Sequence, residues 1–152
     1  MSTSRRAALL LPIAAAACGG PPPPTTVTLN VQGGADQNPD PTGRPSPVAL
    51  SVFFLTATAK FERADVFALT EREQATLGSD SAGSEQFVIG PGERRTITRE
   101  VRQGVQAIGI VALFRDVDTG ARWRAVQAIA PGGSTALNVR LARNTVAVSP
   151  AG

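Results

Sequence analysis

The feature that most constrains the fold is a proline-rich segment that runs directly into an apolar stretch, NPDPTGRPSPVALSVFFL at residues 38–55. The prolines of its first half fix φ and hold each preceding residue near extended geometry, so this half cannot form a helix. The second half, residues 48–55, places alternate side chains on opposite faces, which is the period of a β-strand. The sequence therefore predicts a stiff, exposed loop at the end of a sheet, a usual place for recognition. The alternative is a proline-stiffened connection that binds nothing.

The inventory of reactive side chains restricts the chemistry open to the chain. Its 152 residues include no His, no Tyr and a single Cys. A Ser-His-Asp or Cys-His arrangement, a His-rich metal site and an imidazole acid-base pair each need a residue that the chain lacks. We therefore expect a protein that is not an enzyme and uses no cofactor and no metal. The length and the 42% apolar content suit one globular domain.

The charge balance gives no indication of a nucleic-acid partner. The formal net charge is +3, from 15 basic and 12 acidic residues. Arg5 and Arg6 lie in a segment that we expect to be removed, which leaves 13 basic residues against 12 acidic ones. No basic stripe with interleaved aromatic residues is present in the sequence, so we expect no nucleic-acid binding.

Residues 1–17 have the pattern of an export signal. Arg5 and Arg6 form a positive beginning, and an apolar run follows at residues 7–17. That run is shorter than the roughly 20 residues that a bilayer-spanning helix needs. The sequence therefore predicts a cleaved signal peptide and not a permanent transmembrane anchor.

Cys18, the only cysteine, follows this segment directly. The run AAAC that ends at Cys18 resembles a bacterial lipobox, in which the cysteine is acylated and becomes the N-terminus of the mature protein. Gly19 follows, with no Asp to signal inner-membrane retention, so we expect lipid anchoring to the periplasmic face of the outer membrane. The alternative is cleavage by ordinary signal peptidase, which would leave a free thiol. Residues 18–25 would form a Pro-rich tether.

The rest of the chain is typical of a mainly β protein. Short runs with the period of a strand are separated by Gly- and Pro-rich turns, which favours a two-sheet sandwich of about eight strands over residues 26–148, followed by a tail at 149–152. The expected strands are 26–32, 48–55, 85–89, 95–101, 105–115, 122–129, 135–141 and 145–148. The run at 107–114 is apolar on both faces, which indicates a central strand, and Gly109 within it suits the close approach of another backbone.

One segment, residues 60–78, changes period. Its apolar residues stand three to four apart, which predicts one or two short helices that end at Gly78. The apolar side of this helical insertion must cover something. We expect it to pack on the second face of the strand at 48–55, where Phe53 and Leu55 need covering.

Three further clusters have structural explanations. Asp116, Asp118 and Gly120 could begin a calcium loop, but too few oxygen ligands follow, and a hairpin turn supplied by Asp118 and Gly120 is favoured. An Asp116/Asp118 hydrolase would lack the opposed geometry of paired carboxylates. The arginines at 94, 95 and 99 could bind an anion, but flanking Glu residues favour a solvated strand face. Trp123 could stack on a neighbouring guanidinium, but it is more typical of core.

The order of these pieces resembles the TssJ family, also called VasD or SciN, the outer-membrane lipoprotein of the bacterial type VI secretion system. The resemblance covers residues 18–148, and its most specific parts are GRPSPV at 43–48, LG at 77–78, PGE at 91–93 and FRD at 114–116 ahead of Trp123. It implies a transthyretin-like β-sandwich that faces the periplasm. The family role is to bind the periplasmic domain of the inner-membrane protein TssM and so help assemble the trans-envelope membrane complex.

The resemblance also implies where the partner binds. In that family the loop between the first two strands contacts TssM, and here that loop is residues 33–47. The implied contact residues are Asn38, Asp40, Thr42, Gly43, Arg44 and Pro45. The alternative is a transthyretin-like periplasmic lipoprotein that binds a small molecule or a glycan. Such a site would need a concave patch of exposed aromatics, which is hard to build from six Phe, one Trp and no Tyr.

Overall fold

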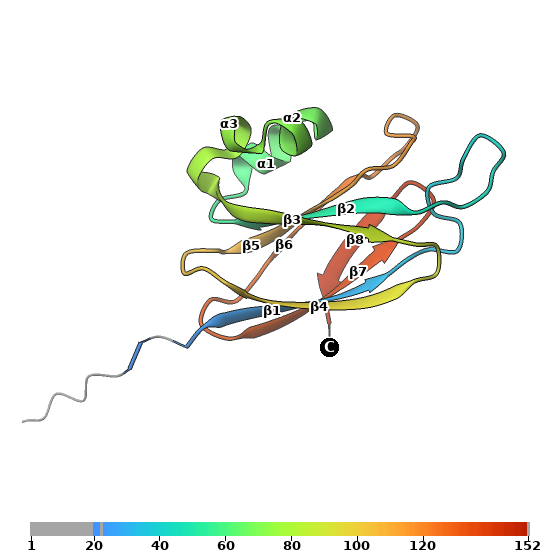
Figure 1. Ribbon diagram of the computed structural model, residues 1–152. Helices are drawn as coiled ribbons and strands as arrows, with labels where there is room; N and C mark the ends of the chain where they lie inside the picture. Colours follow the sequence, from blue (N-terminus) through green and yellow to red (C-terminus); the bar gives the residue numbers. More distant parts are fainter. Residues whose placement is uncertain (1–19, 22, 152) are drawn as a thin grey trace, which may run out of the picture.

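The computed structural model describes residues 20–21 and 23–151, so the predicted signal peptide and Cys18 lie outside the described residues. Two four-stranded sheets pack face to face (Figure 1). Sheet A contains, in spatial order, β4 (Arg94–Val101), β1 (Thr25–Gln32), β7 (Ser134–Leu141) and β8 (Val146–Pro150), and sheet B contains β3 (Ser81–Ile89), β2 (Val48–Leu55), β5 (Ala107–Ala112) and β6 (Arg124–Ala128). Neighbouring strands are antiparallel except β1 and β7, which are parallel. The predicted eight-stranded sandwich is confirmed.

Several strand boundaries differ from the sequence prediction, and those of β5, β3 and β8 show why. The strand expected at 105–115 is only the six residues of β5, because the N–H of Phe114 bonds back to the carbonyl of Ala112 and turns the chain out of the ladder. β3 begins at Ser81, four residues before the expected start, and β8 runs to Pro150, into the segment expected to be a tail. Alternation alone did not reveal these ends, because they are set by pairing with distant strands.

The main core lies between the two sheets. β1 alternates strictly, and its inward residues Val27, Leu29 and Val31 are buried against the inner face of sheet B. β5 is buried on both faces, as expected for a central strand: Ile108 and Ile110 join this core, while Val111 faces the other way. Burial on this scale contributes on the order of 1.5 to 3 kcal/mol per large side chain.

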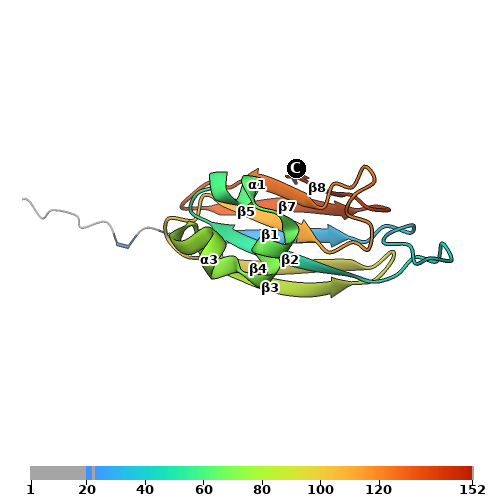
Figure 2. The ribbon, with the colours of Figure 1, turned by 90° about the horizontal axis from the view of Figure 1, so that it is seen from above.

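A second core lies beneath the helical insertion. This consists of α1 (Ala59–Arg63), α2 (Val66–Glu71), α3 (Glu73–Leu77) and a 3-10 turn at Gly78–Asp80, and it covers the outer face of sheet B (Figures 1 and 2). The cluster comprises Phe53, Leu55, Phe61, Leu69, Leu77, Ala107 and Val111. The predicted packing on Phe53 and Leu55 is confirmed. The insertion has three helices, not one or two. Asp65 caps the start of α2, its carboxylate accepting from the N–H of Ala68 at 2.7 Å, and the non-helical backbone of Arg72 separates α2 from α3.

Gly109 serves this second core in a way that the sequence did not reveal. A Cβ at Gly109 would lie 2.7 Å from a ring carbon of Phe61 and 2.9 Å from a methyl of Leu55. The close neighbour is therefore an aromatic side chain of the insertion, and the expectation of another backbone was wrong. The helix end at Gly78 is confirmed, since its φ of 54° is a conformation that glycine adopts without strain.

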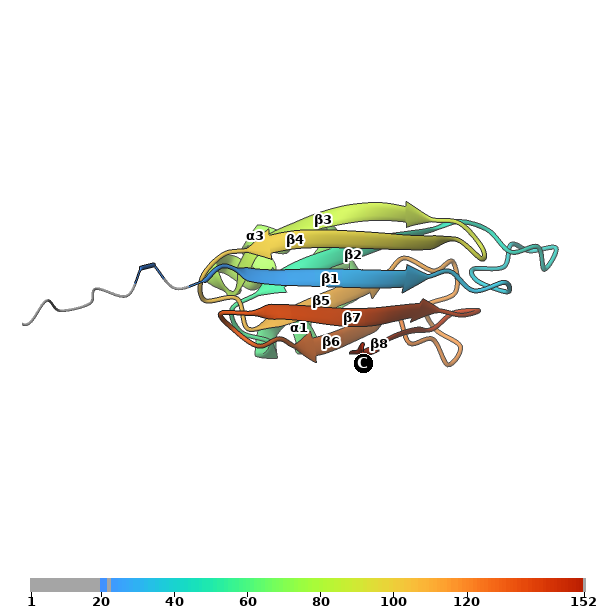
Figure 3. The same ribbon diagram turned by 90° about the horizontal axis from the view of Figure 1, so that it is seen from below.

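The sandwich has two distinct ends. The chain enters β1 at one end, and the loop at residues 33–47 projects from the opposite end, which we call the loop pole (Figures 1 and 3). The loops at residues 113–123 and 142–145 lie at the same pole. None of the helices among residues 20–21 and 23–151 is both long enough and apolar enough to cross a membrane.

Candidate functional site

The base of the 33–47 loop is fixed by the side chain of Gln37, which is fully buried. Its Oε1 accepts from the N–H of Gly34 at 3.0 Å, and its Nε2 donates to the carbonyls of Ile89 at 2.7 Å and Ser46 at 3.3 Å. The Gln37 amide thereby joins the two ends of the loop to the end of β3. Because each bond is buried or partly buried, leaving a partner group unpaired costs about 1 to 3 kcal/mol.

Asn38 joins the loop to its neighbouring loops by hydrogen bonds, and its side chain is buried, with 5% of the residue exposed. Its Nδ2 donates to the carbonyl of Pro47 at 2.9 Å, and its Oδ1 accepts from the N–H of Arg115 at 2.8 Å. The backbone N–H of Asn38 donates to the carbonyl of Arg143 at 2.7 Å. The residue has a φ of 45°, the left-handed region that Asn tolerates better than most residues. Asn38 therefore ties the three loops of the pole together.

The tip of the loop is organised by the carboxylate of Asp40. Its Oδ1 accepts from the N–H of Thr42 at 2.9 Å, the hydroxyl of Thr42 at 2.7 Å and the N–H of Arg44 at 3.0 Å. The Asp40 N–H donates to the carbonyl of Arg44 at 2.8 Å, and the N–H of Gly43 to the carbonyl of Asp40 at 2.8 Å. The Thr42 hydroxyl, followed by the Arg44 N–H, holds the pKa of Asp40 below its ordinary value. The tip is a self-bonded turn.

The structure separates the implied contact residues into two groups. Thr42, Gly43 and Arg44 are exposed at the tip, and Asp40 and Pro45 are partly buried beside them. Asn38 is turned inward and bonded through both ends of its amide, so its side chain supports the loop and offers little surface to a partner. The geometry brings five of these residues to one tip and places the sixth beneath it.

A cavity of ≈ 250 Å³ lies where the three loops meet. Its lining combines the expected loop residues with residues of the two later loops that the sequence did not assign to this site: Asn38, Pro39, Asp40, Pro41, Gly43, Phe114, Asp116, Arg143 and Asn144. Arg143, on the loop at residues 142–145, is exposed. Sequence reasoning missed the residues from the later loops because only the fold brings them to the 33–47 loop.

The segment considered as a calcium loop is a turn. Oδ1 of Asp116 accepts from the N–H groups of Asp118 at 3.1 Å and Thr119 at 3.0 Å, and Gly120 has a φ of 65°. These bonds, that of Thr119 first, hold the pKa of Asp116 below its ordinary value. The turn is as expected, although its carboxylate comes from Asp116 and not from Asp118. Among residues 20–21 and 23–151, no group of three or more His, Cys, Asp or Glu could hold a metal ion.

The arginines considered as an anion site do not converge. Arg95 pairs with Glu93 at 2.6 Å and Arg99 with Glu85 at 2.9 Å, both partly exposed. Arg94 points to the other face of β4, as the alternation of a strand requires. Of the flanking Glu residues, Glu93 pairs with Arg95, whereas Arg99 pairs with Glu85 of β3. Arg95 and Arg99 share the face of β4 that carries the buried Ile97 and Val101, so the predicted solvated face is the one that carries Arg94.

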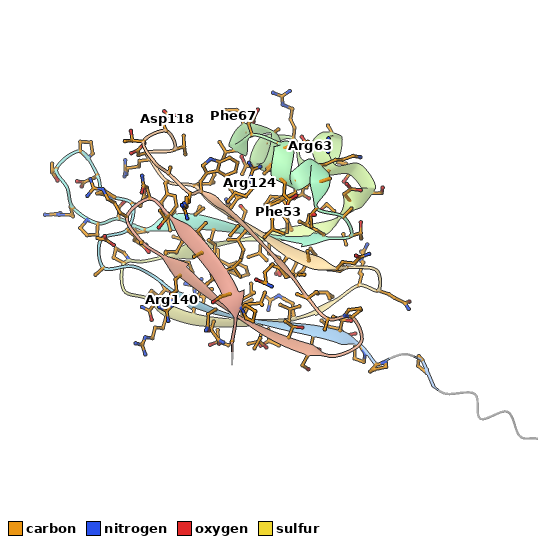
Figure 4. All side chains as sticks on the ribbon, turned by 180° about the vertical axis from the view of Figure 1, so that it is seen from behind. Phe53, Arg63, Phe67, Asp118, Arg124 and Arg140 are labelled. Carbon is orange, nitrogen blue, oxygen red and sulfur yellow. The ribbon has the colours of Figure 1, made fainter. Side chains whose placement is uncertain are left out.

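Trp123 both packs against the core and stacks on a guanidinium, the two interpretations that the sequence left open. It is partly buried against the two cores, and the guanidinium of Arg124 lies 4.5 Å from its ring centroid. The same guanidinium donates to the carbonyls of Phe61 and Ala64, each at 2.6 Å, and so holds α1 on sheet B. Figure 4 shows Arg124 beneath the helical insertion. Burial lowers the pKa of Arg124.

Comparisons with known proteins agree with this architecture. The family described as "Type VI secretion lipoprotein, VasD, EvfM, TssJ, VC_A0113" matches residues 25–144. The T6SS lipoprotein TssJ1 from Pseudomonas aeruginosa is 32% identical, with a TM-score of 0.82 over 86% of this chain and 98% of that one. Serratia marcescens Lip, a membrane-bound component of the type VI secretion system, is 21% identical, with a TM-score of 0.75 over 85% and 97%. No curated protein sequence matches.

A further similar chain comes from a structure described as the T6SS protein TssM C-terminal domain from EAEC. It is 20% identical, with a TM-score of 0.66 over 83% of this chain and 98% of that one, and this likeness concerns the fold alone. The family match covers most of the sandwich, including the whole 33–47 loop and the helical insertion. The resemblance read from the sequence is thus confirmed, and the chain belongs to the T6SS-SciN family of type VI secretion lipoproteins.

Proposed function

We propose that this chain is anchored to the periplasmic face of the outer membrane by acyl groups on Cys18 and binds the periplasmic domain of TssM through the tip of the 33–47 loop. By doing so it helps to assemble the trans-envelope membrane complex of the type VI secretion system. The observation that carries the proposal is the loop pole itself. A self-bonded tip stands on a buried amide base, at the end of the sandwich opposite the tether.

The position of the tether supports this assignment. The first strand begins at Thr25, so only a short Pro-rich segment separates Cys18 from the folded domain. A polyproline II segment of that length spans roughly 20 Å at about 3.1 Å per residue. A domain held so close to the lipid presents its far end most readily to a partner that crosses the periplasm.

The construction of the tip supports it further. Binding usually requires loops to become ordered, which costs affinity. Here the Asp40 carboxylate already fixes the backbone of Thr42 and Arg44 before any partner arrives. The Arg44 side chain remains exposed and can make directional, charge-assisted hydrogen bonds to a partner carboxylate or carbonyl.

Replacement of the tip tests the proposal. Residues 39–44 are exchanged for a Gly/Ser segment of equal length, which keeps the buried amides of Gln37 and Asn38. We expect calorimetry with the periplasmic domain of TssM to show loss of measurable binding, while the melting temperature changes little. A matched control exchanges the exposed residues 102–104, at the opposite end of the sandwich, and should bind as the wild type does. Unchanged affinity in the tip replacement would move the search to the helical insertion.

The anchoring step has its own test. Mass spectrometry of the membrane-extracted protein should show loss of residues 1–17 and diacylglyceryl addition at Cys18. Cys18→Ser should release the protein from the membrane fraction while its domain still binds TssM in solution. An unmodified Cys18 thiol in the membrane-extracted wild type would contradict lipid anchoring without affecting the docking assignment.

A further inference from the structure

The outer face of sheet A contains a concave surface, a groove of ≈ 600 Å³ near the loop pole. Figure 3 views this face, on which no helix or loop covers β4, β1 and β7. Figure 4 shows Arg140 on the side of the sandwich away from the helical insertion. The groove is lined mainly by residues of β1, β4 and β7, together with Gly33 and Gly34 at the start of the 33–47 loop, and it does not include the tip of that loop. Its side chains are Asn30, Gln32, Arg94, Thr96, Asn138 and Arg140.

Strand register arranges these side chains in two rows across the sheet. Gln32 of β1 stands opposite Arg94 of β4 on one side and Arg140 of β7 on the other. With neighbouring strands about 4.8 Å apart, the Cα atoms of the two arginines are roughly 10 Å apart. Both side chains are exposed, and both are long enough to reach a ligand above Gln32. The first row is therefore a cationic clamp around an amide.

The second row is polar and uncharged. Asn30 stands between Thr96 and Asn138, and the hydroxyl of Thr96 lies 3.4 Å from Oδ1 of Asn30. Amides and hydroxyls of this kind can both donate and accept hydrogen bonds. The floor of the groove thus offers donors and acceptors side by side, next to two guanidinium groups that can only donate.

Neither arginine of the clamp takes part in an ion pair of the described residues. Within residues 20–21 and 23–151, the ion pairs join Arg95 to Glu93 and Arg99 to Glu85, and neither involves Arg94 or Arg140. Glu100, on the same face of β4, is six residues from Arg94, or about 20 Å along an extended strand. Two unpaired guanidiniums at this spacing favour a ligand that carries carboxylate or phosphate groups.

The chemistry of the groove distinguishes between possible occupants. A protein partner usually places aromatic or apolar anchors in its contact. The large exposed apolar residues of the described chain are Phe67 on α2 and Val88 on β3, and neither lies on sheet A. A membrane headgroup is disfavoured, because the groove lies toward the pole away from the tether. A sugar chain, by contrast, needs neighbouring donors and acceptors for its hydroxyl and N-acetyl groups.

We propose that this groove binds a carboxylate-bearing glycan strand of the cell envelope. Arg94 and Arg140 hold the carboxylates, and their separation is the length scale of one disaccharide. Asn30, Gln32 and Asn138 bond to the acetamido and hydroxyl groups between them. The sequence argument against a glycan site rested on the lack of exposed aromatics, and an acidic glycan recognised by guanidinium and amide groups does not depend on them. The inference stands independently of TssM binding.

Calorimetry on the full-length lipoprotein in detergent tests this proposal. The probe is a soluble oligosaccharide of alternating N-acetylglucosamine and N-acetylmuramic acid, whose lactyl groups supply the carboxylates. We expect saturable binding that weakens about tenfold or more in Arg94→Gln/Arg140→Gln, as loss of two charge-assisted contacts implies. The charge-matched control Arg63→Gln/Arg102→Gln changes exposed arginines outside the groove and should bind as the wild type does.

Two further probes define the ligand class. Neutral chitotetraose should bind at least about tenfold more weakly, since it cannot engage the clamp. Inorganic phosphate should bind weakly and be insensitive to Asn138→Ala, which should weaken glycan binding severalfold. No binding of the acidic oligosaccharide, equal binding of phosphate, or an equal loss in the control variant would each overturn the proposal. The replacement of residues 39–44 should leave glycan binding unchanged, which separates this site from the docking loop.

Discussion

The base and the tip of the 33–47 loop are built from similar polar residues, but they are put to different uses. At the base, Gln37 and Asn38 are almost completely buried, and their amides bond to groups on other segments of the fold. At the tip, the Asp40 carboxylate accepts hydrogen bonds from Thr42 and Arg44, within the same turn. Removing a base residue therefore disturbs the sandwich, whereas removing a tip residue disturbs only the tip.

This difference shows how one loop can combine rigidity with a replaceable recognition surface. The base transmits the stability of the sheets to the loop, because its bonds reach β3 and the loops at residues 113–123 and 142–145. The tip is shaped locally and can change without a cost to folding. Stability and partner affinity should consequently respond to different substitutions only a few residues apart.

The largest effect is expected at Gln37. Gln37→Leu leaves the N–H of Gly34 and the carbonyls of Ile89 and Ser46 without their amide partner, and should lower the free energy of unfolding by about 2 to 4 kcal/mol. Urea denaturation followed by circular dichroism measures it. Gln103→Leu, at an exposed position, is the control and should change the value by less than about 0.5 kcal/mol. If Gln37→Leu destabilised the fold no more than Gln103→Leu, the base of the loop would not support the sandwich, and it would not differ from the tip in this respect.

Asn38 should give the next largest effect, from two separable sources. Asn38→Ala loses the bonds to Pro47 and Arg115. It also puts alanine at a backbone φ of 45°, where the Cβ is strained and no side-chain hydrogen bond offsets the strain. Asn38→Gly loses the same bonds but relieves the backbone. We expect Ala to cost about 1 to 3 kcal/mol and Gly measurably less. A Gly variant as unstable as the Ala variant would show that the amide bonds alone matter.

Much of this fold could be predicted because its signals are local. Alternation fixed β1 and β2, the change of period located the helical insertion, and prolines identified the stiff loop. The ends of the strands, the number of short helices and the neighbour of Gly109 were missed. Those features depend on pairing and capping contacts that a hydrophobic pattern does not contain.

The composition of the site could be predicted only in part. The exposed tip lies within a single proline-rich segment, so the exposure of Arg44 could be predicted, while its contact with a partner stays a prediction. The role of Asn38 depends on Arg115, which is 77 residues away, and nothing in the sequence joins the two. Arg94 and Arg140 likewise flank the same residue, Gln32, only because β1 pairs with both β4 and β7. Contacts between distant segments were the part that sequence reasoning could not supply.

At the tip, Arg44→Ala should weaken binding of the TssM periplasmic domain by about 1 to 3 kcal/mol and leave the free energy of unfolding nearly unchanged. The backbone groups of Arg44 that bond to Asp40 are kept in this variant, so the turn should persist. Calorimetry and urea denaturation on the same preparations give both quantities. Arg102→Ala, outside the pole, is the charge-matched control. A loss of stability in Arg44→Ala equal to its loss of binding energy would contradict the independence of the tip.

The smallest effect should come from Thr42→Val, which removes one hydroxyl from the tip. That hydroxyl is the largest cause of the lowered pKa of Asp40, so the pKa should rise toward the ordinary 3.8 in the variant. A carboxyl group with a lowered pKa in the folded state contributes stability above its unfolded value, and this contribution is lost as the pH falls through the folded one. The wild-type tip should therefore stay ordered at neutral pH and loosen only in acid below about 3.8.

Titration of the Asp40 side-chain carbonyl by NMR measures this shift directly, with Thr98→Val on the face of sheet A as the matched control. At neutral pH the Thr42→Val tip keeps the bonds from the N–H groups of Thr42 and Arg44 to the carboxylate. Its affinity for TssM should consequently fall less than that of Arg44→Ala. A Thr42→Val variant that bound as weakly as Arg44→Ala would mean that the order of the turn, and not the arginine side chain, governs recognition at this pole.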